Sequence, residues 1–406
     1  MVPEGWTVVE AQEICESISV GVVIKPSQYY VDESMGIKAF RSANVREGFI
    51  NDSDWVYFSQ EGHFANKKSH LKSGDVLIVR TGYPGTACVV TPKFEGTNAI
   101  DIVIARPQKD KVLPEYLCAY TNSSFGKSQV LSLQGGMAQK HLNVGAYQTL
   151  KLKLPPLSEQ RKISQILSTW DKAITTAEQL LTNSQQQKKA LMQQLIAGGK
   201  RFPEFKRRWE NITLSEICIL SAGQAAPQKE KYFINGSHDF IRVSDLGSNT
   251  SRWAPQSRDK VNQLAIRECK LEVVPAKATL FTKSGASLLL NQRAQLKENS
   301  FIVSHLGFAK AKDGVSDDFV FYLMCSIDFN RYAAGTSLPA LQLSVLKSLK
   351  VLLPPYEEQE KIASMLSDAD TEISILEKKL FLLKQEKKAL MQQLLTGKRR
   401  VKAEAA

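Results

Sequence analysis

The sequence predicts an α+β fold in which two mixed α/β domains are joined by two long antiparallel coiled-coil helices, with a pseudo-two-fold internal repeat. Three observations predict it. A segment of about 40 residues occurs twice with closely similar text, which indicates an internal duplication. Apolar residues recur along each copy in steps of four and three, and the sequence before each copy is also repeated, with lower similarity. We therefore expect the order domain, helix, domain, helix.

The strongest repeat lies at the two ends of the expected helices. Residues 154–163 (LPPLSEQRKI) recur as residues 353–362 (LPPYEEQEKI), and residues 188–195 (KKALMQQL) recur unchanged as residues 387–394. Both recurrences are 199 positions apart, so no insertion separates the copies between these marks. Each copy is therefore expected to form the same structural element.

Each copy is predicted to be one long helix. A Pro-Pro pair suits the start of a helix but not its interior, and acidic residues in the first turn complement the helix dipole. Gly198 and Gly397 close the two segments, and basic residues follow each glycine. The roughly 40 residues between these marks correspond to about 60 Å of helix.

The apolar positions of both segments follow a seven-residue rhythm that indicates a coiled-coil seam. Because a long apolar seam on a solitary helix would stay in contact with water, the economical partner of each helix is the other one. A two-fold relation between the halves favours antiparallel pairing, and the alternative is two separate helices that each dock on their own domain. The positions are Ile163, Leu167, Trp170, Ile174, Ala177, Leu181, Ser184, Lys188, Leu191 and Leu195 in the first copy, and Ile362, Leu366, Ala369, Ile373, Leu376, Leu380, Leu383, Lys387, Leu390 and Leu394 in the second.

Each domain is expected to combine short strands with short helices. Residues 76–79 and 100–104 are β-branched runs bounded by Gly, Pro or Asn, as strands commonly are. The faint repeat relates Val2 to Phe202, Trp6 to Trp209 and Tyr116 to Tyr322, so its offset drifts between 200 and 206 positions. The predicted segments are residues 1–153 and 201–352 for the domains, 154–200 and 353–400 for the helices, and 401–406 for a tail.

The charge balance favours a polyanionic partner. Lys and Arg outnumber Asp and Glu by 53 to 41, which gives a net charge of +12, and phosphates reward such contacts by releasing counterions. Six cysteines without any Cys-x-x-Cys pair are typical of reduced thiols in a cytosolic protein. The first residues lack a secretory signal, and no apolar run approaches the roughly 18 residues that a membrane helix needs. We expect a cytoplasmic protein.

Catalytic motifs are not found in the sequence. No Gly-x-Gly pair occurs, which argues against a standard glycine-rich nucleotide loop. Pro354-Pro355-Tyr356 resembles the motif of amino-methyltransferases, but Leu353 stands where that motif needs a polar residue. Asp259 with residues 268–270 fits a nuclease pattern only superficially, because the first domain has no such set. We expect no catalytic residue, no metal site and no cofactor in this chain.

Basic and polar loops remain as the candidate site. Residues 80–85 and 283–287 follow apolar strands in both domains, and a Gly in each lets the backbone come close to phosphate. For each residue alone, a solvated turn with a surface charge is an equally good interpretation. Recurrence favours Arg80 and Lys283. The candidate DNA-binding residues are Arg41, Lys67, Lys68, Arg80, Thr81, Tyr83, Arg242, Arg252, Arg258, Lys283, Ser284 and Arg293.

Essentially the full chain resembles the specificity subunit of type I restriction-modification enzymes. The resemblance is carried by the two LPPxxEQ openings, the two helix ends KKALMQQL, and the phrases at residues 73–82 and 280–285. It implies that residues 1–153 and 201–352 are target-recognition domains, each reading one half of a bipartite double-stranded DNA site. It also implies that the helices, called conserved regions, bind two methyltransferase subunits, through which restriction subunits join. S-adenosylmethionine, ATP and Mg²⁺ then belong to those partners.

Three alternatives stay open at this point. A self-contained methyltransferase or nuclease would need activity from the chain alone, which the missing motifs argue against. A coiled-coil assembly scaffold with protein-binding domains would show no sequence-dependent DNA binding. A specificity protein of this build could also serve a bifunctional restriction enzyme.

Overall fold

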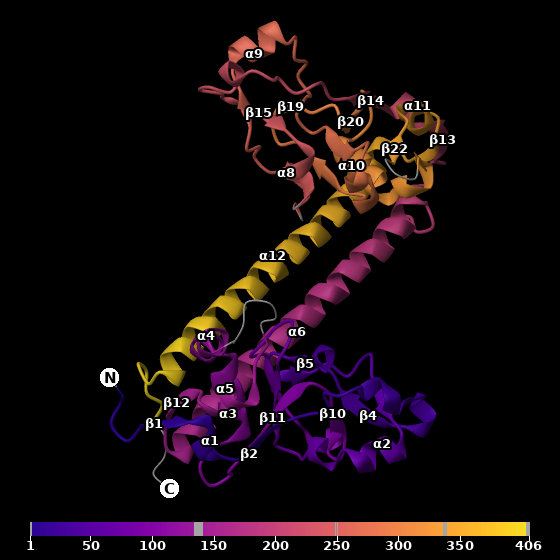
Figure 1. The fold of residues 1–406 in the computed structure, drawn as a ribbon. Coiled ribbons are helices and arrows are strands. Elements are labelled where there is room, and N and C mark those ends of the chain that lie inside the picture. Colours follow the sequence, from indigo (N-terminus) through magenta and orange to yellow (C-terminus); the bar gives the residue numbers. More distant parts are fainter. Residues whose placement is uncertain (1, 134–140, 248, 250, 336–338, 403–406) are drawn as a thin grey trace. The chain divides into compact units, whose positions relative to one another are not determined.

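The computed structural model describes residues 2–133, 141–247, 249, 251–335 and 339–402, which form two compact units (Figure 1). Unit 1 comprises Met1–Ala177 and Leu380–Ala406, and unit 2 comprises Glu178–Lys379. Each unit contains one α/β domain together with one half of each long helix, α6 (Leu157–Ile196) and α12 (Tyr356–Leu395). Within the predicted tail, residues 403–406 lie outside the described residues.

In unit 1, short strands form two sheets of four strands. One has the order β2-β11-β8-β9 and is antiparallel throughout; the other has the order β10-β4-β7-β3, in which β10 pairs with β4 in parallel. The elements are β1 (Thr7–Glu10), α1 (Ala11–Ile14), β2 (Cys15–Val20), β3 (Tyr30–Val31), β4 (Ile37–Phe40), β5 (Val45–Arg46), β6 (Phe49–Ile50), β7 (Val56–Phe58), α2 (Gln60–Ala65), β8 (Val76–Val79), β9 (Ala87–Val89), β10 (Asn98–Ala99), β11 (Ile102–Pro107), α3 (Pro114–Asn122), α4 (Ser124–Ser132), α5 (Val144–Gln148) and β12 (Lys151–Leu154).

Unit 2 repeats this plan. Its antiparallel sheet has the order β14-β20-β17-β18, and a second sheet has the order β16-β15-β19. The elements are β13 (Glu210–Thr213), α7 (Leu214–Ile217), β14 (Cys218–Ala222), β15 (His238–Ile241), α8 (Val243–Gly247), β16 (Lys260–Val261), α9 (Gln263–Glu268), β17 (Thr279–Thr282), β18 (Arg293–Gln295), β19 (Phe301–Ile302), β20 (Leu306–Ala311), α10 (Asp317–Ser326), β21 (Ala333–Ala334), β22 (Ala340–Leu341), α11 (Leu343–Lys347) and β23 (Lys350–Leu353).

The predicted internal repeat is confirmed element by element. The starts of α1 and α7, of α2 and α9, and of β8 and β17 are each 203 residues apart, whereas those of α5 and α11 and of α6 and α12 are 199 apart. At an offset of 203, the counterpart of Tyr116 is Phe319. The pairing of Tyr116 with Tyr322 that the text suggested is therefore wrong, because the sequence match followed residue type and not position in the helix.

The repeated Glu-Gln pair at the start of each long helix has a structural role that the sequence did not reveal. The buried Gln160 amide donates to the carbonyl of Pro155 at 2.8 Å and accepts from the N–H of Leu113, the residue before α3, at 2.9 Å. In unit 2, the buried Gln359 makes the same two contacts with Pro354 and Ser316, at 2.8 and 2.9 Å. This glutamine joins each long helix to the short helix of its own domain.

The glutamate of the pair holds the opening segment of the same domain. In unit 2, Glu358 is fully buried and accepts hydrogen bonds from Arg201, at 3.0 and 2.8 Å, and from the Trp209 indole at 2.9 Å. The equivalent set in unit 1 is Glu159 with Arg400 and Trp6. The carboxylate of Glu358 raises the pKa of the Arg201 guanidinium, and Glu159 does the same for Arg400.

The helices pair in antiparallel fashion within each unit, as predicted. In unit 1, Lys387 of α12 donates to Asp171 of α6 at 2.5 Å, and in unit 2 the equivalent Lys188 of α6 pairs with Asp370 of α12. A high residue number on one helix thus meets a low number on the other. The lysine that interrupts the apolar seam is therefore one half of a symmetric ion pair.

Each long helix also contributes to the core of its own domain. In unit 1, Ile163 and Leu167 of α6 belong to the core that contains the fully buried Tyr116 and Tyr147. In unit 2, Ile362 of α12 occupies the equivalent place. The alternative of a helix docked on its own domain is thus realised together with the pairing. No helix in the described part of the chain is long and apolar enough to cross a membrane.

Candidate nucleic-acid interface

The two strongest candidate loops leave equivalent strands in the same way. Residues 80–86 follow β8 in unit 1, and residues 283–292 follow β17 in unit 2. The carbonyl of the first loop residue accepts a hydrogen bond from a leucine N–H in both units: Leu142 donates to Arg80 at 3.0 Å, and Leu341 donates to Lys283 at 2.8 Å. The two loops therefore start from the same backbone geometry and differ in the side chains they present.

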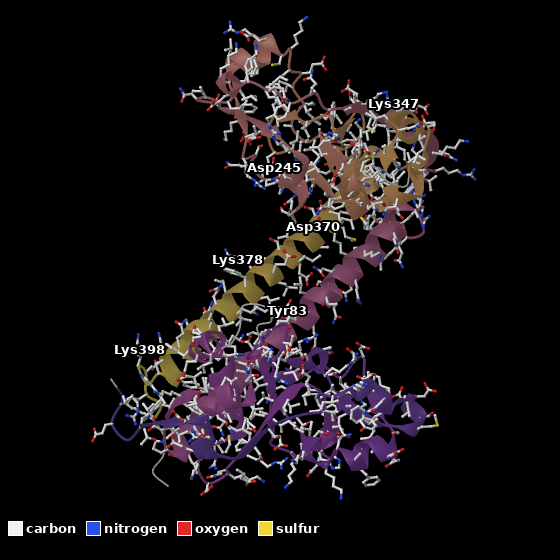
Figure 2. The ribbon with its side chains drawn as sticks, in the orientation of Figure 1. Tyr83, Asp245, Lys347, Asp370, Lys378 and Lys398 are labelled. Carbon is white, nitrogen blue, oxygen red and sulfur yellow. The ribbon has the colours of Figure 1, made fainter. Side chains whose placement is uncertain are left out.

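In the unit 1 loop, the exposed side chains are Thr81 and Tyr83, the latter 83% exposed (Figure 2). Arg80 is different, because only 12% of its side chain is exposed. Its guanidinium forms an ion pair with Asp101, and its Nε donates to the Leu142 carbonyl at 2.9 Å. Arg80 thus fixes the base of the loop, while Thr81 and Tyr83 are free to contact a ligand.

In the unit 2 loop, Lys283 is half-buried, and its ammonium group makes no ion pair with any described residue. The Ser284 hydroxyl lies 2.7 Å from Nδ1 of His305, which occupies the place of Asp101 in unit 1. Gly285 has a φ of +87°, a left-handed conformation that glycine adopts without strain, and Gly82 in the other loop has a φ of +88°.

Arg41 and Arg242 stabilise matching turns in the two units. The Arg41 N–H donates to Asn44 Oδ1 at 2.9 Å, and the Arg242 N–H donates to Asp245 Oδ2 at 2.8 Å. Both side chains are about one third exposed and already face a carboxylate. The carboxylates are those of Asp54, 3.0 Å from Arg41, and of Asp259, which pairs with Arg242.

Three candidate cations are more accessible. Lys67 and Lys68 are exposed in a 3-10 turn after α2, and neither forms an ion pair within the described residues. Arg258 is 79% exposed and forms a long ion pair, at 3.7 Å, with Asp245, which is labelled in Figure 2. Lys67 and Lys68 could therefore reach a phosphate without breaking an ion pair, and Arg258 would give up only the long one to Asp245.

Arg252 and Arg293 lie inside unit 2. The Arg252 side chain is 8% exposed and forms an ion pair with Asp318. The Arg293 guanidinium lies 3.5 Å from the centre of the Phe329 ring, and burial lowers its pKa to about 10. Both guanidinium groups already have internal partners, so a DNA contact by either one would have to displace these partners.

Sequence reasoning overlooked an apolar part of the unit 2 loop. Leu289 and Leu290, in the 3-10 turn Ala286–Leu290 of this loop, are 54% and 61% exposed. The run of three leucines at 288–290 was a signal for it, but a search for cations and polar residues passes over such a run. Exposed apolar groups beside cations are suited to contacts with sugars and base faces.

Among the described residues, no group of three or more His, Cys, Asp or Glu could hold a metal ion. The six cysteines are free, and burial raises the pKa of Cys15, Cys88 and Cys218 to about 12, which keeps these thiols protonated.

The fold and the loops define a class of internally duplicated proteins, with two α/β domains that present different side chains from one backbone plan. A family model described as "Type I restriction modification DNA specificity domain" matches residues 3–183 and again residues 206–385. The chain belongs to this family. It is a DNA specificity subunit of a type I restriction-modification system, in which catalysis resides in partner subunits.

Individual relatives are similar over nearly their whole length. The type I restriction enzyme MjaVIII specificity subunit of Methanocaldococcus jannaschii is 24% identical, and the match covers 99% of this chain and 94% of that protein. A chain from a structure described as "Structural basis underlying complex assembly and conformational transition of the type I R-M system" has a TM-score of 0.62 at 19% identity, covering 98% of this chain and 100% of that chain. The S subunit of M. genitalium has a TM-score of 0.58 at 12% identity, covering 97% and 96%. At these identities the structures show that the fold is shared.

Proposed function

We propose that this subunit recognises a bipartite site on double-stranded DNA, with one domain for each half-site. The observation that supports it best is the pair of loops at residues 80–86 and 283–292. Both are held by the same leucine-to-carbonyl hydrogen bond, yet one presents Thr81 and Tyr83 and the other presents Lys283, Leu289 and Leu290. A common backbone with different exposed side chains suits two readers of different half-sequences.

In this proposal the residues that face DNA fall into two groups. The exposed cations Lys67, Lys68 and Arg258 contact phosphates and fix the orientation of each domain. Thr81, Tyr83, Lys283 and Ser284 contact base edges or sugars. Arg41, Arg80 and Arg242 stabilise the turns behind these residues, and each contacts DNA only after releasing its aspartate partner. The recognition domains span residues 1–153 and 201–352.

The proposed partners are two methyltransferase subunits, with restriction subunits bound through them. The two-fold repeat of the helical segments, residues 154–200 and 353–400, supports two equivalent docking sites. Large apolar side chains are exposed on these helices, including Leu180 and Ile375 in unit 2 and Phe381 in unit 1, at 49%, 61% and 61%. Such exposure is typical of a surface that a protein covers. S-adenosylmethionine, ATP and Mg²⁺ are then bound by the partners, and the assembly works on DNA in the cytoplasm.

Methylation sequencing of host DNA tests this function directly. The gene is compared in its intact and deleted forms, with the partner methyltransferase gene left in place. Loss of adenine methylation at one split motif with a fixed gap supports the proposal. Unchanged methylation in an otherwise active system would instead favour a scaffold with protein-binding domains. Methylation and cleavage from a single partner polypeptide would show that the chain serves a bifunctional enzyme.

A further inference from the structure

Arg252 fills the space between the sheet, α10 and α12 of unit 2. Its guanidinium pairs with Asp318 and donates to Gln295 Oε1 at 3.0 and 2.7 Å and to Ser367 Oγ at 3.1 Å. The rings of Phe321 and Tyr322 lie 5.2 Å from it. A positive charge is therefore built into this space, surrounded by one carboxylate, by the oxygens of Gln295, Ser367 and Tyr322, and by three aromatic rings, those of Trp253, Phe321 and Tyr322.

Arg252 belongs to an extended segment that pairs with the edge of the sheet and places its side chain in this space. The Gln295 N–H donates to the Arg252 carbonyl at 2.8 Å, and the Ala254 N–H donates to the Gln295 carbonyl at 2.9 Å. These two bonds form a parallel bridge between Trp253 and Gln295, on the outer side of β18. Residues 252–254 thus act as a short additional strand, and Arg252 projects from it.

The equivalent residues in unit 1 also include an acidic residue and a serine, but smaller side chains replace the two aromatic ones of α10. At the offset of α3 and α10, Asp318 corresponds to Glu115, whereas Phe321 and Tyr322 correspond to Cys118 and Ala119. The equivalents on α6 and the sheet edge follow from the helix offset and from the pairing of β8 with β9. They are Ser168 for Ser367, Asp171 for Asp370, and Val89 for Gln295.

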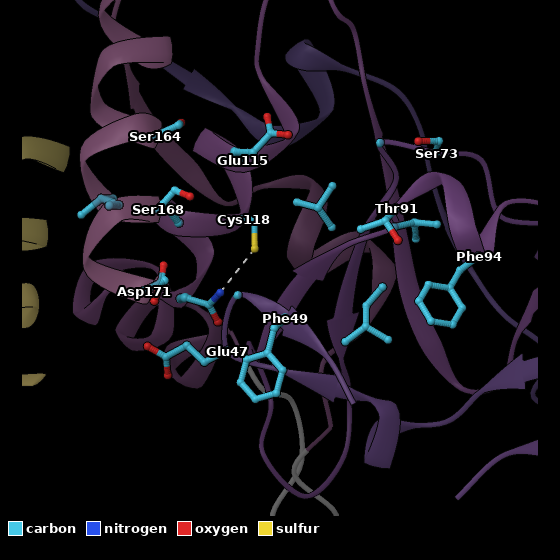
Figure 3. A pocket seen from close by; sticks show the side chains of 18 of the residues that line it. Glu47, Phe49, Ser73, Thr91, Phe94, Glu115, Cys118, Ser164, Ser168 and Asp171 are labelled. Atoms are coloured by element: carbon cyan, nitrogen blue, oxygen red, sulfur yellow. Dashed lines mark hydrogen bonds between the residues drawn. The ribbon is translucent and has the colours of Figure 1, made fainter. Parts of the chain in front are cut away.

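These smaller side chains leave a cavity of about 800 Å³ in unit 1 (Figure 3). Val89, Glu115, Cys118, Ala119, Ser168 and Asp171 all line it. Figure 3 shows Ser164, Ser168 and Asp171 along one side of α6, facing Glu115 and Cys118. The Ser164 hydroxyl is buried without a hydrogen-bond partner among the described residues, and Glu115 has no hydrogen-bond or ion-pair partner there.

The sheet edge beside the cavity is open at Val89. β9 is the edge strand of its sheet, as β18 is in unit 2. At Ala87 the edge is occupied, because the Ala87 N–H donates to Asn122 Oδ1 at 2.9 Å and the Ala87 carbonyl accepts from Asn122 Nδ2 at 2.8 Å and from the Gly48 N–H at 2.9 Å. Within the described residues, no bridge like that of Trp253 pairs with the outer side of β9 at Val89.

We propose that this unit 1 cavity binds an arginine side chain carried by an extended segment of a partner protein. The segment adds to the outer edge of β9, and its guanidinium enters between Glu115 and Ser168, as that of Arg252 does between Asp318 and Ser367. An extended peptide is favoured over a free cation because an open strand edge supplies backbone hydrogen bonds that only a peptide can use. The proposal rests on the proposed function only in taking the partner to be a subunit of the same complex.

A peptide copied from the chain itself provides the probe. A fluorescein-labelled peptide with the sequence of residues 251–255, SRWAP, is titrated with the full-length chain, and its anisotropy is followed. We expect saturable binding of one peptide per chain, since the equivalent space in unit 2 is already filled. Replacing the peptide arginine by citrulline, which keeps the shape but removes the charge, should weaken binding by about tenfold or more.

Variants of the cavity locate the binding. Ala119→Arg places a second positive charge in the cavity and should abolish binding, and Glu115→Gln should weaken it by about tenfold. Glu61→Gln is the matched control, because Glu61 is an exposed glutamate in the first turn of α2 and does not line the cavity. Thermal melting of each variant verifies that it is folded.

Three outcomes would overturn the proposal. They are no peptide binding at millimolar concentration, binding that Ala119→Arg leaves unchanged, and equal binding of ethylguanidinium and of the peptide, which would make the cavity a small-molecule site. None of these measurements involves DNA, and methylation sequencing involves no peptide. The proposed cavity ligand and the proposed function can therefore fail separately.

Discussion

Units 1 and 2 have nearly the same strands and helices but fill the space beside the long helix differently. In unit 2, Arg252 and the rings of Phe321 and Tyr322 occupy it, whereas in unit 1 the corresponding Cys118 and Ala119 leave a cavity. The Glu-Gln pair at the start of each helix makes the same contacts in both units. The contacts between each long helix and its domain are therefore the same in both units, whereas the loops and the edge of the sheet differ between them.

The largest expected effect concerns the glutamate of that pair. Glu358→Ala removes a fully buried carboxylate and leaves Arg201 and Trp209 without their acceptor. Loss of one partner of a buried pair should lower the melting temperature by about 6–12 °C for a unit of this size. Glu159→Ala should have a smaller effect, since its partner Arg400 is 44% exposed. Differential scanning calorimetry of the full chain measures both, and equal shifts would contradict the difference in burial.

The next prediction concerns the charge that fills the space in unit 2. Arg252→Ala removes a donor from Asp318, Gln295 and Ser367, while the backbone of residues 252–254 stays paired with β18. The chain should therefore lose stability, and ethylguanidinium at millimolar concentration should restore part of the lost melting temperature in this variant and not in the wild type. The comparison of the two units fails if the variant melts at the wild-type temperature or if ethylguanidinium stabilises both proteins equally.

A smaller effect is expected from the exposed lysines after α2. Replacing Lys67 and Lys68 together by alanine should weaken DNA binding by the assembled complex by a similar factor for every sequence. The slope of log K against log salt concentration should become shallower by about 0.9 for each lysine that contacts a phosphate. Lys347→Ala, at an exposed lysine in the last turn of α11, is the control (Figure 2). A change in sequence preference without a change in salt dependence would argue against a phosphate role.

The smallest prediction concerns pH and the corner at α7. The Thr213 hydroxyl and N–H donate to Glu216 and hold the pKa of its carboxyl below the usual value. The stabilisation is present above the unfolded pKa of about 4.3 and is lost as pH falls through the lower folded pKa. The melting temperatures of the wild type and Glu216→Gln should therefore differ at neutral pH and converge in acid. A difference that grows in acid would reverse the sign.

Much of the fold could be predicted because its signals are local or repeated. The two long helices followed from an exact recurrence and a seven-residue rhythm, and each is 40 residues long in the structure. The role of the Glu-Gln motif could not be predicted, since Glu159 meets Trp6 and Arg400, which are 153 and 241 residues away. The strand order could not be predicted either, because the sequence of a short strand does not indicate which strands pair with it.

The candidate site was harder to predict, for a related reason. Charge and polar surroundings in the sequence do not distinguish a cation that faces solvent from one with a distant partner. Arg252 was included on those grounds, but its partners Asp318 and Ser367 are 66 and 115 residues away. Lys67 and Lys68, chosen by the same criterion, are exposed. The DNA contacts of all twelve residues stay predictions.

The central claim is that each domain reads its own half-site, and methylation sequencing of a domain-duplication strain tests it most directly. Residues 201–352 are replaced by a second copy of residues 1–153, and the long helices are kept. The account predicts a methylated motif in which one half is retained and the other becomes its inverted copy. Methylation at the original, unchanged motif would contradict it, as would the loss of both original halves in favour of an unrelated sequence.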